Sequence, residues 1–264
     1  MKLGIVGHGV VGQACSKGFK ALGHEVTIHD ISLNTKMKDL YNCEIIYICV
    51  PTPVGNLGEC DVSIVRSCVE ELSLQSFAGL VAIKSTVVPG TTENMKKKFE
   101  NLSICFVPEF LRERCAYKDF TLNHDLLAVG TDCKIDAEKI IESHGNYPKS
   151  ISIISSTEAE VLKYFSNVYN ATKVIFANNF FEICDKLNAD YMKILDSYMK
   201  RNVNPRDYLE VSENLRGYGG GCLPKDTKAI AHLARKLGSQ LSLFDQVEED
   251  NSNLKTTVFD GMRS

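Results

Sequence analysis

The stretch "KLGIVGHGVVGQ", Lys2 to Gln13, decides the fold. An apolar run leads directly into a GxGxxG pattern, Gly7, Gly9 and Gly12, and a helical pattern opens with Val10 and Val11. In this pattern the first glycine permits a tight turn and the second lets a pyrophosphate approach backbone N–H groups. The third lets helix and strand pack closely. The triplet alone is weak evidence, so the prediction of a dinucleotide site depends on the sequence that follows it.

Asp30 closes the next apolar run, "EVTIHD", 18 residues after Gly12. A carboxylate at this place accepts hydrogen bonds from the ribose hydroxyls of adenosine and repels a 2′-phosphate. The alternative, a solvated residue at the end of a strand, is weaker in this context. The sequence therefore predicts NAD, rather than NADP, as the cofactor.

Further apolar runs alternate with helical patterns: "CEIIYICV", "GLVAIKS", "LSICFVP" and "LLAVG". Runs that are apolar throughout are typical of a parallel sheet covered on both faces. From about Ser156, some 30 residues follow without Gly or Pro, which indicates one long helix. We expect an α/β protein with a Rossmann-type doubly wound parallel sheet followed by an all-helical domain, divided as 1–154, 155–240 and a tail at 241–264.

Composition excludes several classes of function. A net charge of −3, with 44% hydrophobic and 24% charged residues, gives no sign of a nucleic-acid partner. Ten cysteines without a CxxC pair and six scattered histidines predict no metal site. The chain opens on a strand pattern and has no long apolar run, so we expect no membrane span, and the many unpaired cysteines favour the cytoplasm.

Three proline-containing loops follow predicted strands: "VPTP" (50–53), "KSTVVPG" (84–90) and "VPEFLRE" (107–113). Ligands of such sheets bind beyond the carboxyl ends of the strands. Each loop taken alone is explained as a turn, but together they favour a reaction cleft. Their hydroxyl and carboxylate residues are Thr52, Ser85, Thr86, Glu109 and Glu113.

The long predicted helix carries two different faces. Ser156 or Thr157 suits its N-cap. Glu160, Lys163 and Asn167 are three and four residues apart and share one polar face. A buried Lys–Asn pair beside a cofactor would orient a substrate oxygen, whereas an exposed pair would be only solvated. The expected packing face consists of Val161, Phe165, Val168, Ile175, Phe180, Ile183 and Leu187.

"GYGGGCLPKD", residues 217–226, places Cys222 among glycines and before Pro224, which is favoured in a first helical turn. The helix dipole there lowers the pKa of a thiol, and the glycines let a ligand approach the backbone. A thiolate beside NAD can capture an aldehyde formed from a primary alcohol. A second oxidation then gives a thioester, which water cleaves to the acid. The motif therefore predicts a four-electron oxidation that uses two NAD per turnover.

The motifs "GHGVVG", "VPTP", "KSTVVPGT", "PEFLRE", "AEVLKYFSN" and "GYGGGCLPKD", in this order, resemble those of the UDP-glucose/GDP-mannose dehydrogenase family. The resemblance implies that Cys222 is the nucleophile and that Lys163 and Asn167 stabilise the oxygen on the reacting carbon. It implies that Asp226, Thr86 and Glu109 hold water or relay protons. The implied cofactor contacts, added to the first loop, are Thr52, Thr86, Glu113 and Lys225. The implied substrate contacts are Phe110, Leu111, Lys163, Asn167, Tyr218, Gly219 and, from a neighbouring subunit of a homodimer, Arg206.

UDP-glucose is the favoured substrate and GDP-mannose the alternative. A β-hydroxyacid or 6-phosphogluconate dehydrogenase is disfavoured because that class has no use for a nucleophilic cysteine. The chain departs from the family's pattern at Arg114, where a glycine is usual, and at Leu126, where an arginine is usual. Relatives also carry a third, nucleotide-gripping domain, yet only 42 residues follow Cys222. We therefore expect either a minimal enzyme or a fragment, and an NAD-binding relative without turnover is a further alternative.

Overall fold

A computed structural model describes residues 1–53, 59–201, 217–218, 227, 231, 234–235 and 237–254 of the 264-residue chain. The chain divides into two compact units, Met1–Asn167 and Val168–Ser264. The expected division at 154/155 and 240/241 stays a prediction.

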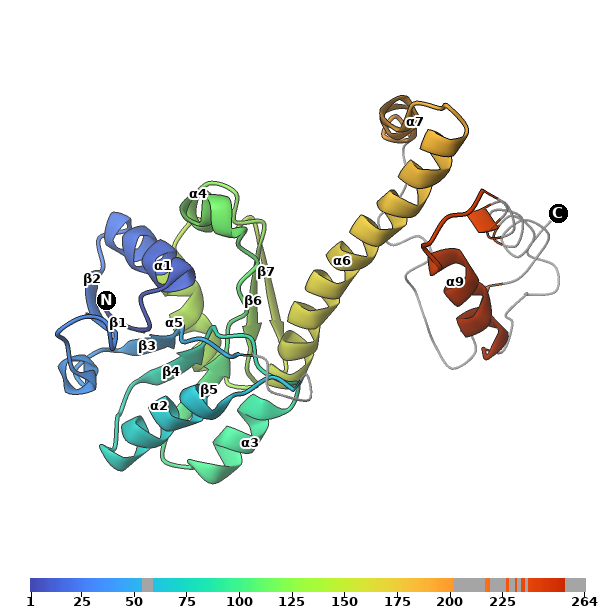
Figure 1. The fold of residues 1–264 in the computed structure, drawn as a ribbon. Coiled ribbons are helices and arrows are strands. Elements are labelled where there is room, and N and C mark those ends of the chain that lie inside the picture. The colour runs from blue at the N-terminus through green and yellow to red at the C-terminus, as the bar shows by residue number, and fades with distance from the viewer. Residues whose placement is uncertain are drawn as a thin grey trace. The chain divides into compact units, whose positions relative to one another are not determined.

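The elements of the first unit alternate between strands and helices (Figure 1). They are β1 Lys2–Val6, α1 Val10–Ala21, β2 Glu25–His29, η1 Met37–Leu40, β3 Ile45–Ile48, α2 Ser63–Leu74, β4 Leu80–Ile83, α3 Thr91–Lys98, β5 Ser103–Phe106, η2 Glu113–Cys115, α4 Ala116–Thr121, β6 Leu126–Gly130, α5 Lys134–His144 and β7 Ser150–Ile154. Then α6, Ser156–Lys186, continues from the first unit into the second, where α7 Tyr191–Tyr198 and α9 Leu243–Ser252 follow.

The seven strands form one sheet in the order β2-β1-β3-β4-β5-β6-β7. All neighbours pair in parallel except β5 and β6, which meet in antiparallel orientation at Phe106 and Gly130. The predicted doubly wound sheet is thus confirmed. Beyond β6, the last predicted strand, the chain adds the helix α5 and a seventh strand, β7. After β1 the chain forms β2 on one side of β1, and it then crosses to form β3 on the other side of β1. Ligands of such sheets bind at this reversal, which lies beside the loop after β1.

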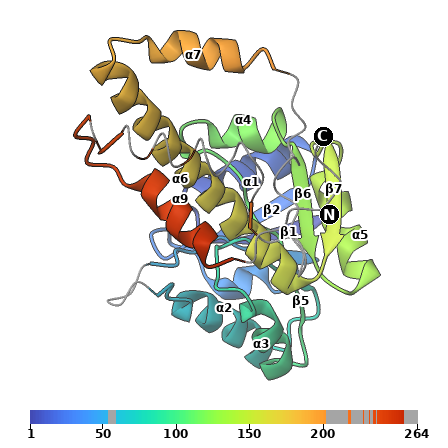
Figure 2. The same cartoon turned by 90° about the vertical axis from the view of Figure 1, so that its right-hand side faces the viewer.

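Buried side chains form one core on each face of the sheet. Ile46 and Ile48 of β3 pack with α2 and α3 residues, while Ile45 and Tyr47 pack with residues of α1, α4 and α5. Figure 2 shows α2 and α3 together on one face of the sheet. Because alternate residues of a strand point to opposite faces, a strand covered on both sides must be apolar throughout.

The second unit has a smaller core around the C-terminal half of α6. Ile183, Ala231, Ala234 and Phe244 are buried in it. The Phe180 and Phe244 rings lie 5.1 Å apart in an edge-to-face arrangement. Thus α9, in the segment expected to be a tail, contributes a core side chain to this unit.

Candidate functional site

The loop after β1 has the shape that its glycines require. Gly7 has φ +88°, and a Cβ there would lie 2.6 Å from the carbonyl oxygen of Cys49. A Cβ on Gly12 would lie 2.0 Å from the carbonyl oxygen of Gly7. Both predicted structural roles, the tight turn and the close packing, are therefore confirmed. Gly9, the N-cap of α1, has no atom within 4 Å of its Cβ position, so the space that a pyrophosphate needs is present.

The Asp30 carboxylate is held beside this loop. It accepts hydrogen bonds from the backbone N–H of His8 (2.6 Å), and from the backbone N–H (2.8 Å) and hydroxyl (2.5 Å) of Ser32. The Ser32 hydroxyl, and then the His8 N–H, lower the pKa of Asp30 to about 2. The group is therefore an anionic acceptor at neutral pH, as binding of ribose hydroxyls requires.

The loops after β3 and β4 are tied to each other by Ser85. Its buried hydroxyl donates to the carbonyl oxygens of Ile48 (3.3 Å) and Val50 (2.7 Å). This hydroxyl is used for structure, whereas the backbone carbonyl of the half-buried Thr86 accepts from the Cys60 thiol. Thr52 is half-buried in the adjoining loop. Among the described residues, the side-chain hydroxyls of Thr86 and Thr52 have no hydrogen-bond partner, so both stay candidates for contact with a ligand.

Glu109, after β5, forms a buried ion pair that the sequence did not reveal. Its Oε2 atom lies 3.0 Å from Nζ of Lys84, and the two side chains are 9% and 1% exposed. Its Oε1 atom accepts from the backbone N–H of Phe110 (2.9 Å). Burial lowers the pKa of Lys84, but the Glu109 carboxylate, and after it the thiols of Cys15 and Cys49, together raise this pKa above its ordinary value. The sequence contains one indication of this ion pair: Lys84 directly follows an entirely apolar strand. A lysine at such a place is buried and must be paired with an opposite charge.

Lys163 of α6 reaches this ion pair from the other side. Its ammonium donates to the backbone carbonyl of Glu109 and lies 3.5 Å from Oδ1 of Asn167. It also lies 5.5 Å from the centre of the Phe110 ring. Burial lowers the pKa of Lys163, the Glu109 carboxylate partly offsets this, and the Lys84 charge lowers it further. The structure thus brings together Lys163, Asn167, Glu109 and Phe110, from two predicted motifs.

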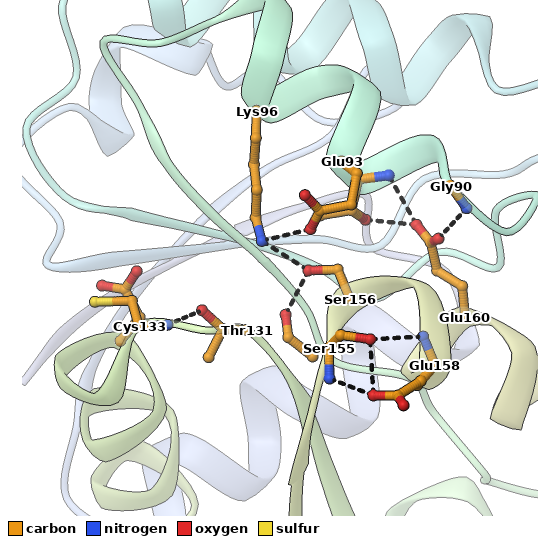
Figure 3. Close-up of polar contacts among 12 residues, drawn as sticks. Gly90, Glu93, Lys96, Thr131, Cys133, Ser155, Ser156, Glu158 and Glu160 are labelled. Atoms are coloured by element: carbon orange, nitrogen blue, oxygen red, sulfur yellow. Dashed lines mark hydrogen bonds and ion pairs between the residues drawn. The ribbon is translucent and has the colours of Figure 1, made fainter.

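Glu160 corrects the predicted polar face of α6. It is fully buried, and its carboxylate accepts hydrogen bonds from the N–H of Gly90 (2.5 Å) and from the N–H (2.8 Å) and hydroxyl (2.6 Å) of Thr92 (Figure 3). It therefore satisfies free donors at the start of α3 instead of facing water beside Lys163. The start of α6 is one residue earlier than predicted: the Ser155 hydroxyl accepts from the N–H of Glu158, whose carboxylate accepts from Ser155 in return.

The predicted packing face of α6 is buried only toward the C-terminal end of the helix. Ile183 is 4% exposed and Phe180 is half-buried. The others are 47% to 59% exposed in this chain: Val161, Phe165, Val168, Ile175 and Leu187. We expect this face to be buried either against the first domain or against a second subunit. The described residues of this chain bury only its C-terminal end, and burial against a second subunit stays a prediction.

The remaining predicted residues fall into two groups. Glu113 is exposed in η2 and lines a cavity of about 500 Å³ together with Val10, which is consistent with a shared ligand. The backbone of Tyr218 is held by the Asn251 side chain of α9, at 2.8 Å and 3.1 Å. Val11 and Leu111 are half-buried. Cys222, Asp226, Lys225, Arg206 and Gly219 lie outside the described residues.

Within the described ranges, no group of histidine, cysteine and carboxylate side chains could hold a metal ion. None of the helices in those same ranges is both long and apolar enough to cross a membrane.

Comparison with known proteins gives the family of the chain. Residues 31–144 match the NAD binding domain, and residues 157–253 the central domain, of the UDP-glucose/GDP-mannose dehydrogenase family. The chain is 27% identical to UDP-glucose 6-dehydrogenase TuaD of Bacillus subtilis, over 98% of this chain and 64% of that protein. It is also 27% identical to GDP-mannose 6-dehydrogenase of Pseudomonas aeruginosa, over 98% of this chain and 70% of the relative.

A crystal structure of GDP-mannose dehydrogenase from Pseudomonas aeruginosa has the same fold, with a TM-score of 0.87 at 24% identity over 96% of this chain and 69% of that chain. The chain spans about two thirds of the length of these relatives. The cofactor predicted from the first loop, NAD, is confirmed by the domain match. The chain belongs to the UDP-glucose/GDP-mannose dehydrogenase family.

Proposed function

We propose that this chain catalyses the NAD-dependent oxidation of the primary alcohol of a nucleotide sugar to the carboxylate, with UDP-glucose as the substrate and UDP-glucuronate as the product. One observation carries the proposal: Lys163 and Asn167 approach each other beside the backbone of Glu109 and the Phe110 ring, at the edge where the strands end. An ammonium with a lowered pKa, next to an amide, suits the stabilisation of an oxygen whose charge changes during reaction.

In the proposed reaction each residue has a separate task. When bound, NAD would supply the hydride acceptor for both oxidation steps. Lys163 and Asn167 hold the oxygen on the reacting carbon, and the thiolate of Cys222 adds to the aldehyde as a thiohemiacetal. Loss of a second hydride and a proton gives a thioester. Water then breaks its C–S bond, which releases the acid and returns the thiolate. Thr86, Glu109 and Asp226 hold this water and take up protons.

The other proposed contacts concern binding. Gly7, Gly9, Val10, Val11 and Gly12 would hold the pyrophosphate, and Asp30 the adenosine ribose. Thr52, Glu113 and Lys225 would complete the cofactor site. The backbone of Phe110 and Leu111, with Tyr218 and Gly219, would bind the sugar nucleotide.

We also propose a homodimer formed through α6. Several large apolar side chains of this helix and of α7 are about half exposed, among them Val168, Phe176, Phe181 and Ile194. Large apolar side chains exposed in this number are typical of a protein that buries them against a partner. In the dimer, Arg206 would reach the substrate of the partner subunit. Val168→Glu is expected to shift the sedimentation coefficient from that of a dimer to that of a monomer, and an unchanged coefficient would contradict this interface.

The test counts NADH formed per UDP-glucose consumed, in the wild type and in Cys222→Ser. The proposal predicts two NADH per molecule of acid in the wild type and no acid from the variant, with NAD affinity unchanged. One NADH per sugar, or acid formation by the variant, would refute it.

GDP-mannose is the second candidate substrate, since a relative of equal identity is named for it. The same assay with GDP-mannose decides between the two by the ratio of kcat/KM values. If neither nucleotide sugar is consumed while NAD binds firmly, the chain is a binding protein that does not turn over.

A further inference from the structure

Lys84 is a cation in an apolar environment. Its side chain is 1% exposed, and its ammonium lies 5.9 Å from the ring centres of both Tyr47 and Phe120. Taking an ammonium out of water costs several kcal/mol unless a partner compensates the charge. The partner is the Glu109 carboxylate at 3.0 Å. If position 84 served only for packing, an uncharged side chain of similar size, such as methionine, would suffice. The buried positive charge therefore indicates a further role.

Glu109 connects Lys84 to Lys163 through two different groups. Its carboxylate is fixed by Lys84 on one oxygen and by the N–H of Phe110 on the other. Its backbone carbonyl accepts the hydrogen bond from the Lys163 ammonium. While both carboxylate oxygens are held, the side chain of Glu109 stays directed away from Lys163, whose ammonium contacts the Glu109 carbonyl, Asn167 and the Phe110 ring instead.

We propose that Lys84 is a positioning residue for Lys163: by holding the Glu109 carboxylate, it keeps that carboxylate away from the Lys163 ammonium and leaves the ammonium free to meet substrate. This inference rests on the proposed function for its effect on turnover, but its structural part is independent of any substrate. Without Lys84, the Glu109 carboxylate would still act on the Lys163 ammonium, which already lies against the backbone carbonyl of the same residue. The two would then form an ion pair, and Lys163 would be drawn away from the reacting oxygen.

Two charges act on Lys163 in opposite directions. The Glu109 carboxylate raises the pKa of Lys163 and the Lys84 ammonium lowers it. The other titratable groups near Lys84 are the thiols of Cys15, Cys49 and Cys105, the phenol of Tyr47, and the imidazoles of His124 and His144. Burial, and next the charge of Lys84, lower the pKa of both imidazoles, so these histidines are neutral at pH 7 and carry no competing charge.

The test measures the rate at which trace amounts of an amine-specific acylating reagent label Lys163 in the full chain, as a function of pH, with the labelled peptide identified by mass spectrometry. Lys84→Met is expected to slow labelling at each pH, because Glu109 then stabilises the charged form of Lys163. Glu109→Gln is expected to accelerate it, because the stabilising charge is gone. Lys84→Arg, which keeps the positive charge, is expected to label at nearly the wild-type rate.

The matched control is Lys134→Met, because the Lys134 side chain is 88% exposed and forms a surface pair with Glu138 at 3.7 Å. General loosening of the fold would change the labelling of Lys163 in the same direction in every destabilised variant, so the opposite shifts of Lys84→Met and Glu109→Gln separate positioning from damage. Equal labelling of Lys84→Met and wild type, or slower labelling of Glu109→Gln, would overturn the inference.

Turnover gives the second readout. In Lys84→Met, kcat with UDP-glucose is expected to fall about 10- to 100-fold, the usual cost of misplacing a catalytic group by about 1 Å, while the KM for NAD stays the same. Lys84→Arg is expected to recover most of the loss. A wild type that labels as predicted but consumes no nucleotide sugar would refute the proposed function and leave the Lys84–Glu109–Lys163 arrangement standing. A normal kcat in Lys84→Met would overturn the positioning role.

Discussion

Replacement of Glu160 by alanine tests how α6 is attached to the sheet domain. The carboxylate accepts three hydrogen bonds, from two backbone N–H groups and one hydroxyl at the start of α3, and the residue is fully buried. A hydrogen bond to a charged group contributes about 1.5–3 kcal/mol, so three would sum to about 4.5–9 kcal/mol. Such contributions are not additive, water can enter the space, and single substitutions rarely exceed about 4–5 kcal/mol. We therefore expect Glu160→Ala to lower the free energy of unfolding by about 3–5 kcal/mol.

The assay is urea unfolding, together with hydrogen exchange of the Gly90 and Thr92 amides, which are expected to exchange faster in the variant. Glu158→Ala is the matched control, because Glu158 lies two residues away and only completes an exposed capping box with Ser155. Its expected cost is clearly smaller than that of Glu160→Ala, because its carboxylate is exposed and its hydrogen bonds compete with water. Equal losses in the two variants, or unchanged amide exchange in Glu160→Ala, would refute the reasoning. Since Lys163 lies one turn further along α6, kcat is also expected to fall in Glu160→Ala.

Three further outcomes follow from single contacts. Gly9→Ala is expected to change the free energy of unfolding by less than about 0.5 kcal/mol, because its Cβ meets no atom within 4 Å, yet to weaken NAD binding measured by calorimetry. Gly12→Ala is expected to weaken NAD binding and also to cost about 1–3 kcal/mol or more, because its Cβ would lie 2.0 Å from the carbonyl oxygen of Gly7; equal stability of the two variants would contradict this. His144 is buried, and its pKa lies well below the usual value, so the unfolded chain takes up a proton below about pH 6.5 that the folded chain does not, and stability falls as the pH falls. His144→Phe is expected to flatten this dependence between pH 6 and 5 by up to about 1.4 kcal/mol per pH unit in denaturant titrations, and an unchanged slope would contradict the assignment.

The sheet and the cofactor loop could be predicted because their determinants are local. The tight turn at Gly7 and the close packing at Gly12 follow from residues a few positions apart. The entirely apolar strands indicate that both faces of the sheet are covered, as the structure shows. The proximity of Lys163 and Asn167 likewise follows from helix periodicity, and the structure places the pair beside Glu109.

The errors concern side chains whose partners are distant in sequence. Glu160 has helical spacing with Lys163, but its acceptor atoms are used by Gly90 and Thr92, about 70 residues earlier. In the sequence, Lys84 is interpreted as part of a turn-forming loop, and only the structure shows that it pairs with Glu109. Periodicity gives the face of a helix to which a residue belongs, and it cannot tell what that face meets.

A structure of Cys222→Ser with NAD and UDP-glucose bound would show whether the proposed groups meet the reacting carbon. We expect Nζ of Lys163 and the side-chain amide of Asn167 both to lie within hydrogen-bond distance of the oxygen on the C6 atom of the sugar, and Oγ of the serine at position 222 to contact that carbon. A sugar bound with C6 remote from Lys163, or a residue 222 directed away from it, would contradict the proposed mechanism.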